Sequence, residues 1–160
     1  MKPARHPTAL RIAALLEAAG VRGEVVEFDQ PTRTSADAAA AIGCTVSEIA
    51  KSIVFRGAES GNAVVVVASG GNRVSEEKVA ACIGERIARG DADFVRERTG
   101  YAIGGVAPVG LPPEVTVLLD EGLRQFTTVW AAAGTPFSVV SLVPDQLPAL
   151  TGGAWSTLAV

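Results

Sequence analysis

The chain has 160 residues, 48% of them hydrophobic, and a formal net charge of −3. This length is enough for one ordinary domain with its own core, and no linker-like stretch divides it, so we expect a single domain over residues 1–160. The acidic balance argues against a broad surface that coats nucleic acid. A protein that grips only the end of a charged polymer, however, needs no basic face.

The first twenty residues predict an amphipathic helix rather than a signal peptide, because an Arg and a Glu interrupt the apolar stretch. We expect the helix from about Thr8 to Ala19, closed by Gly20, with an apolar face made of Leu10, Ala13, Ala14 and Leu16. The longest apolar runs are too short to span a bilayer. We therefore expect a soluble, cytoplasmic protein with no membrane partner.

A strand within 21–28 and a short Ala-rich helix come next, and we expect Ser35 to cap this helix and Gly43 to end it. Thr45 and Glu48 have the spacing of a capping box, which predicts one helical turn leading directly into a strand. That strand begins near Lys51. The lysine is therefore expected at a helix-to-strand junction.

The segments 52–57 and 62–70 predict an antiparallel hairpin, because a short polar connection containing glycine joins them. The unbroken apolar run Val64–Val67 indicates burial on both faces of a sheet that helices cover. The fold class expected is α/β, a single compact domain with a mixed β-sheet flanked by helices.

Further elements follow from cap and strand signals. Helices are expected at 75–84 and 91–100, and together they should cover one face of the sheet. Further strands are expected at 114–123 and 136–143, with 125–134 between them and a closing helical turn at 144–150.

The segment "RTGYAIGGVAPVG", residues 98–110, holds four glycines and one proline, which predicts a shaped loop. Glycines allow a backbone to approach a ligand closely and free its N–H groups to point at an oxygen or a phosphate. A tight crossover between a helix and a strand would have the same composition. The pattern matches neither the dinucleotide fingerprint nor the P-loop, and both interpretations stay open on composition alone.

Three segments taken together carry a resemblance: "AKSIVF" at 50–55, "TGYAIGGVAPVG" at 99–110, and "VWAAAG" before a strand and a final "DQL". With these motifs the chain resembles the YbaK/ProX family of aminoacyl-tRNA deacylases, which is related to the editing domain inserted in bacterial prolyl-tRNA synthetases. The resemblance covers nearly the whole chain. It implies a strongly curved, barrel-like mixed sheet and a hydrolase that cleaves the ester between a wrong amino acid and the 3′ adenosine of a tRNA.

The same resemblance implies the site residues. Lys51 matches the residue most associated with activity, and the backbone N–H groups of Gly104 and Gly105 would hold the ester carbonyl as an oxyanion hole does. A cation at an apolar strand end costs desolvation unless an anion meets it, although a snorkelling lysine is an alternative from sequence alone. The substrate-binding residues implied are Phe28, Ser52, Tyr101, Val106, Pro108, Ala132 and Gly134.

Several kinds of catalytic group are missing from the sequence. His6 is the only histidine, and Cys44 and Cys82 lie in Ala/Ile settings that predict buried structural thiols. We therefore expect no catalytic triad, no metal site and no cofactor, and hydrolysis would depend on positioned water and the substrate's own groups. No general base is assigned, because the candidate acids have simpler interpretations as loop or capping residues: Asp29, Asp37, Asp120 and Glu121.

Specificity is less well defined. Cysteinyl-tRNA deacylases of the family carry a serine in the turn where this chain has Ala131–Ala133, and an aspartate soon after, where this chain has "TPFSVV". Cysteine is therefore disfavoured as the substrate side chain. Phe28, Phe137 and the alanines would shape a small apolar pocket that separates similar side chains poorly, so alanine, serine, cysteine and other small residues stay open.

The expected partner is the 3′ end of an aminoacyl-tRNA, gripped by Lys51 and by whichever of Arg33, Arg56 and Arg73 lie near the pocket mouth. A synthetase or an elongation factor would help to deliver it. Two alternatives to a freestanding trans-editing hydrolase are considered. One is a binding module of the same fold without activity, and the other is a Schiff-base lyase built on Lys51.

Overall fold

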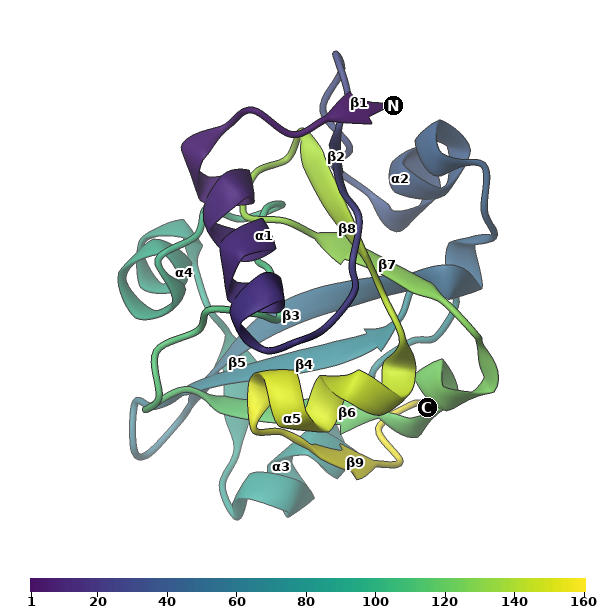
Figure 1. Ribbon diagram of the computed structural model, residues 1–160. Helices are drawn as coiled ribbons and strands as arrows, with labels where there is room; N and C mark the ends of the chain where they lie inside the picture. The colour runs from purple at the N-terminus through teal and green to yellow at the C-terminus, as the bar shows by residue number, and fades with distance from the viewer.

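One mixed sheet of nine strands runs through the molecule in the order β1-β2-β8-β7-β3-β4-β6-β9, with β5 paired to β3 (Figure 1). The computed structural model describes every residue from Met1 to Val160. The strands are β1 (Lys2–Pro3), β2 (Val25–Glu27), β3 (Ile49–Gly57), β4 (Ala63–Ser69), β5 (Ile87–Arg89), β6 (Thr116–Asp120), β7 (Val129–Ala132), β8 (Ser138–Leu142) and β9 (Ala154–Ser156).

Helices pack on both faces of this sheet (Figure 1). They are α1 (Pro7–Ala18), α2 (Ser35–Ile42), α3 (Glu76–Ile83), α4 (Ala92–Thr99) and α5 (Leu147–Thr151), with 3₁₀ turns η1 (Val46–Glu48), η2 (Glu121–Gln125) and η3 (Pro144–Gln146). The single α/β domain with a mixed sheet that the sequence predicts is therefore confirmed. The short strands β1, β5 and β9 have too few residues to give a sequence signal, and they were not expected.

The predicted hairpin of β3 and β4 forms the centre of the sheet. The two strands are antiparallel, and β4 also pairs in parallel with β6. Every residue of β4 is buried, as its unbroken apolar run predicts. A strand with neighbours on both edges and helices on both faces has no exposed side.

Helices α3 and α4 lie on opposite faces of this hairpin, which corrects the expectation that they share one face. Val79 of α3 packs in one apolar cluster with Val64 and Val66. Phe94 of α4 packs in another cluster with Val65 and Val67. Because successive side chains of a strand point to opposite faces, the two clusters are separated by the sheet itself.

The helix caps largely follow the sequence. Ser75 and Asp91 cap α3 and α4 as predicted, each accepting a backbone hydrogen bond through its side chain. Helix α2 begins one residue earlier than expected. The Thr34 hydroxyl accepts from the Asp37 N–H at 3.0 Å, so Thr34 is the cap and Ser35 is the first helical residue.

Helix α1 has the predicted length but a different buried face. Ala9, Ile12 and Leu16 are buried, whereas Leu10 is 49% exposed. Of the predicted face, only Leu16 is therefore fully inside the core. An Ala-rich helix has apolar residues all round, so its sequence pattern does not fix which stripe contacts the sheet.

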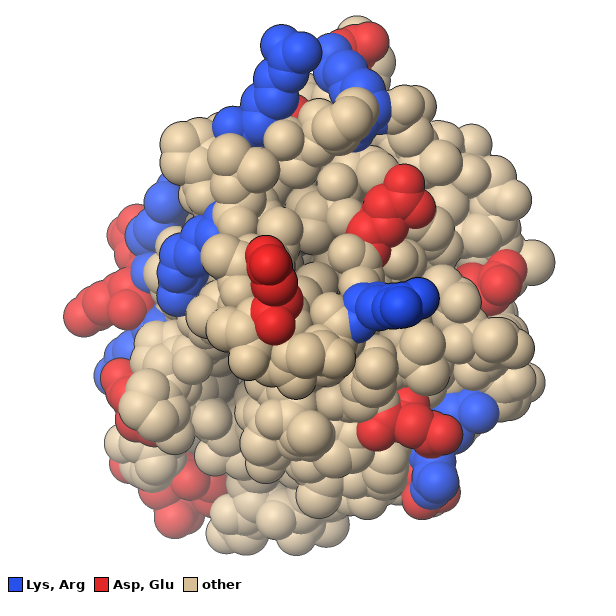
Figure 2. All heavy atoms as spheres, viewed as in Figure 1, with Lys and Arg blue, Asp and Glu red and all other residues tan.

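On the face in Figure 2, Lys and Arg side chains are interspersed with Asp and Glu, including near the middle of the view, and most of this face is uncharged. None of the helices combines the length and the apolar character needed to cross a lipid bilayer. Cys82 is exposed and Cys44 is half-buried, so the expectation of two buried thiols is wrong for Cys82.

The edge of β3 that faces away from β4 has an opening in the middle. Strand β7 pairs with its first residues, Ile49 and Ala50, and β5 pairs with its last three, Phe55–Gly57. Between them, the segment Lys51–Ile53 has no strand partner on this edge. The opening lies at the lysine that the sequence singles out.

Candidate functional site

A cavity of about 310 Å³ lies beside this opening. Its walls come from the start of β3, from β7, from the residues that lead into α2, and from the glycine-rich loop. Its charged residues are Arg33, Lys51 and Arg89, and no carboxylate or imidazole lines it. The cavity is therefore suited to an anionic ligand.

Lys51 reaches the edge of the cavity from the third position of β3. The predicted capping box precedes it: the Glu48 carboxylate accepts from both the N–H and the hydroxyl of Thr45 at 2.9 Å. The turn then leads directly into the strand, as predicted. The Lys51 ammonium donates to the Asn72 carbonyl at 2.6 Å.

A buried carboxylate stands behind this contact. The Asn72 amide donates to Asp120 at 3.2 Å, and the Leu158 N–H donates to the other oxygen of Asp120, which is 2% exposed. Burial lowers the pKa of Lys51, the nearby charge of Arg89 lowers it further, and Asp120 opposes both. Lys51 is thus a partly desolvated cation that forms no ion pair.

Ser52 is the second unusual group in the wall. Its hydroxyl oxygen is buried and has no hydrogen-bond partner. An unsatisfied buried hydroxyl costs about 1–3 kcal/mol. Since Ser52 lines the cavity, a polar group of a bound ligand would remove this cost.

The two adjacent glycines of the loop have different surroundings. Gly104 is exposed, lines the cavity and has a φ of 86°, in the left-handed region that favours glycine. Gly105 is buried, and a Cβ on it would lie 2.8 Å from the Thr135 Cα. Its N–H donates to the Ala102 carbonyl at 3.0 Å. Gly105 therefore packs the loop against the neighbouring turn, and its N–H is not free for an oxyanion.

The N–H of Gly104 makes no hydrogen bond within the protein, and neither does that of Val106, which also lines the cavity. Five of the ten predicted site residues thus lie around one cavity: Lys51, Ser52, Gly104, Val106 and Ala132. Gly105 fits the crossover interpretation of the glycine-rich segment, and Gly104 has the position that the ligand-binding interpretation would require.

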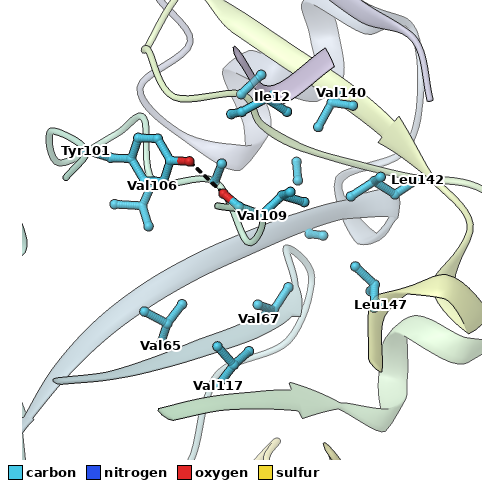
Figure 3. Packing of buried hydrophobic residues seen from close by; sticks show 14 of the residues in the cluster. Ile12, Val65, Val67, Tyr101, Val106, Val109, Val117, Val140, Leu142 and Leu147 are labelled. Carbon is cyan, nitrogen blue, oxygen red and sulfur yellow. Dashed lines mark hydrogen bonds between the residues drawn. The ribbon is translucent and has the colours of Figure 1, made fainter. Parts of the chain in front are cut away.

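Tyr101 lies outside the cavity and inside the core. It is 1% exposed, and its hydroxyl donates to the Val109 carbonyl at 2.6 Å (Figure 3). Burial raises the pKa of Tyr101. Its position ties the two ends of the glycine-rich loop together and leaves no path to a ligand.

The other predicted residues also lie away from this cavity. Pro108 lines a different one, and Gly134 packs against Thr8 and Ile12 of α1. The Phe28 N–H donates to the Phe137 carbonyl at 2.8 Å, and neither side chain reaches the cavity. A motif match identifies a segment, but alternate residues of that segment face the core.

Among the predicted arginines, only Arg33 lines this cavity. Arg56 lies over the Phe94 ring, 5.5 Å from its centroid, and Arg73 lines an adjacent cavity. Arg89 was not predicted as a site residue, because β5, which carries it, gives no sequence pattern of its own. Other wall residues were also not predicted: Thr32, Thr34, Ser35 and Trp130.

The remaining wall is apolar and made largely of small side chains. It consists of Ala38, Ile49, Ala50, Ile103, Val106, Trp130, Ala131, Ala132 and Val139. No three His, Cys, Asp or Glu side chains are grouped closely enough to hold a metal ion. The cavity therefore offers cations, free N–H groups and an apolar surface, and its own residues supply no general base.

Comparison with known proteins gives a consistent result. A family described as the aminoacyl-tRNA editing domain matches residues 29–150. The uncharacterized protein YwhH of Bacillus subtilis is 37% identical over 124 residues, 78% of each chain. EbsC of Enterococcus faecalis, named as a proposed Cys-tRNA(Pro)/Cys-tRNA(Cys) deacylase, is 25% identical over 121 residues, 75% of this chain and 73% of EbsC.

A solved structure agrees over the whole fold. The crystal structure of a proposed trans-editing enzyme for prolyl-tRNA synthetase superposes with a TM-score of 0.89 at 40% identity, covering 98% of this chain and 99% of that one. The fold and the activity class that the resemblance implied are thereby confirmed. The chain belongs to the aminoacyl-tRNA editing domain family, whose members are deacylases and therefore hydrolases.

Proposed function

We propose that the chain hydrolyses the ester joining a small aliphatic amino acid, alanine first, to the 3′ adenosine of a mischarged tRNA(Pro). The observation that carries this proposal is the cavity beside Lys51, which combines three cations, two free N–H groups and an apolar wall without a carboxylate. Each part matches one part of the substrate. The cations suit the phosphate, the N–H groups suit the ester carbonyl, and the wall suits a small side chain.

Lys51 binds and positions the substrate in this proposal. Its ammonium is partly desolvated and forms no ion pair, so a phosphate of the tRNA end would supply the missing anion. The Asn72 carbonyl holds the side chain at the edge of the cavity until then. The Schiff-base alternative is not needed, because an ester requires no amine nucleophile for hydrolysis.

The chemical step is the attack of water on the ester carbonyl carbon. The carbon–oxygen bond to the ribose breaks, the 3′ oxygen leaves with a proton, and the amino acid is released as a carboxylic acid. The N–H groups of Gly104 and Val106 are the free donors that would stabilise the developing negative charge on the carbonyl oxygen. No acid or histidine lines the cavity, so the proton would pass through water or the substrate's own ribose hydroxyl or amino group.

Ser52 adds a polar contact inside the cavity. Its hydroxyl has no partner within the protein and would bind the ribose or the amino group of the substrate. The small apolar wall supplies the side-chain site. Such a wall separates side chains that differ by one methylene by only about 1–3 kcal/mol, so the preference among small residues should be graded.

The identity of the tRNA rests on the relatives. The solved structure is described as an enzyme for prolyl-tRNA synthetase, and EbsC is named for Cys-tRNA(Pro). By analogy we propose tRNA(Pro), with action in trans in the cytoplasm, where aminoacyl-tRNA is made. A synthetase or an elongation factor would present the substrate.

The test is a deacylation panel of Ala-, Ser- and Cys-tRNA(Pro) with the wild type, Lys51→Ala and Lys78→Ala. Lys78 is the matched control, because its ammonium donates to the Ala159 carbonyl and lies outside the cavity. We expect hydrolysis of Ala-tRNA(Pro) by the wild type and the control, but not by Lys51→Ala. Binding of every tRNA without turnover would reject the enzyme and support the inactive binding module.

A further inference from the structure

A second cavity, of about 570 Å³, adjoins the first. The two share Lys51 and Arg89, so they lie on either side of this basic pair. Ile53, Phe55 and Val74 give the second cavity an apolar wall. A chain-like ligand could pass from one cavity to the other across two cations.

Four of the five charged residues that line the second cavity have side chains without a partner in the protein, and the fifth, Lys51, donates to the Asn72 carbonyl. Arg73, Arg89, Glu76 and Glu77 line or border it, and none of their side chains forms a hydrogen bond or an ion pair. The one ion pair of the structure, between Lys2 and Asp29, lies elsewhere. Two guanidinium groups and two carboxylates are therefore all available to a ligand that offers both an anion and a hydrogen-bond donor.

We propose that the second cavity binds the penultimate nucleotide of the tRNA 3′ end, a cytidine, while the first holds the aminoacylated adenosine. This inference rests on the proposed function. The phosphate that joins the two nucleotides would lie between them, at the shared pair Lys51 and Arg89. Because the two cavities share this pair, each cavity would hold one nucleotide.

The chemistry of the second cavity favours cytosine over uracil. The N4 amine of cytosine is a donor that carboxylates accept, which the side chains of Glu76 and Glu77 can supply. Uracil presents an acceptor oxygen at the same position and would face negative charge. The apolar wall would contact the flat face of the base, while the carboxylates accept from the N4 amine at its edge.

The experiment uses alanyl minihelices of tRNA(Pro) that end in CCA or in CUA, together with binding of the trinucleotides CCA and CUA followed by NMR. We expect the wild type to lose about tenfold in kcat/KM and in affinity when uridine replaces the cytidine. In the double variant Glu76→Gln/Glu77→Gln this preference should vanish or reverse, because an amide can donate to the uracil oxygen. Glu97→Gln, a change on α4, is the matched control and should keep it.

A second arm tests the phosphate contact. Arg89→Ala should reduce the slope of log affinity against log salt by about one, whereas Arg86→Ala, just before β5 and lining neither cavity, should leave the slope unchanged. Thermal melts confirm that each variant is folded. Equal activity of the wild type on both ends, or an unchanged preference in the double glutamine variant, would overturn the cytidine site and leave the proposed function standing. Hydrolysis of neither end would overturn the proposed function itself.

Discussion

The two halves of β3 show how one strand serves both structure and function. Its last residues lie between β4 and β5, with Phe55 buried against Val64 and Val66. Its early segment Lys51–Ile53 pairs with β4 alone and borders the cavity. Where both edges are paired, side chains fill the space. Where one edge is open, polar groups such as the Ser52 hydroxyl are left for a ligand.

We expect changes at the open half of β3 (Lys51–Ile53) to affect activity and changes at its paired half to affect stability. The largest effect is expected for Lys51→Met, which keeps the side-chain stem and removes the charge. Deacylation should fall by about 100-fold, the scale of rate loss expected when a substrate is no longer held in position for reaction. Single-turnover rates with circular dichroism would measure it. Near-normal turnover in a folded variant would show that activity does not depend on this charge.

The adjacent glycines of the loop should also differ, one affecting mainly stability and the other mainly activity. Gly105→Val should displace the loop from the turn at Thr135, because the added Cβ would clash with the Thr135 backbone. We expect a loss of about 3 kcal/mol in the free energy of unfolding. A Cβ on Gly104 would meet only the Pro136 ring, at 3.9 Å, so Gly104→Val should lose about 1–2 kcal/mol of stability from its left-handed φ, with a larger loss of activity. Urea unfolding and turnover give both quantities. Similar profiles for the two variants would contradict the assignment of separate roles.

Val65 of β4 lies opposite Val54, next to the paired half of β3. Val65→Ala removes two methyl groups from this fully buried position. The cavity left behind should cost about 2 kcal/mol of stability, which lowers the melting temperature by about 4–8 °C. Turnover per folded molecule should not change, because Val65 does not line the site. Calorimetry and an assay well below the melting temperature test this. A loss of turnover at low temperature would show that core packing beside the paired half also affects the site.

The smallest effect concerns pH. Burial, and then the charge of Arg89, lower the pKa of Lys51 in the folded protein, so the unfolded chain keeps this proton to higher pH. Between the two pKa values unfolding takes up a proton, and stability therefore rises with pH relative to Lys51→Met. Trinucleotide affinity should fall over the same range as the ammonium is lost. Melting temperatures and titrations from about pH 8 to 11 would show these opposite trends, and parallel trends would contradict them.

The sequence by itself determined the elements whose signals are local. Ser75 and Asp91 cap their helices through hydrogen bonds to backbone groups three residues away, and the Glu48 turn places Lys51 just inside the strand that follows. The unbroken valines of β4 required burial on both faces. These features depend on neighbours in the chain, so the residue pattern is sufficient to predict them, and the family motifs pointed to a loop that lines the cavity.

Only the tertiary structure decided which residues meet. Tyr101 turns into the core, Gly105 packs against Thr135, and Arg89 reaches the cavity from a three-residue strand without a signal of its own. Lys51 contacts Asn72 because β4 brings the following turn back beside the start of β3. Such contacts join residues far apart in sequence. They depend on sheet order and on which edge of β3 stays open, and no local pattern encodes either.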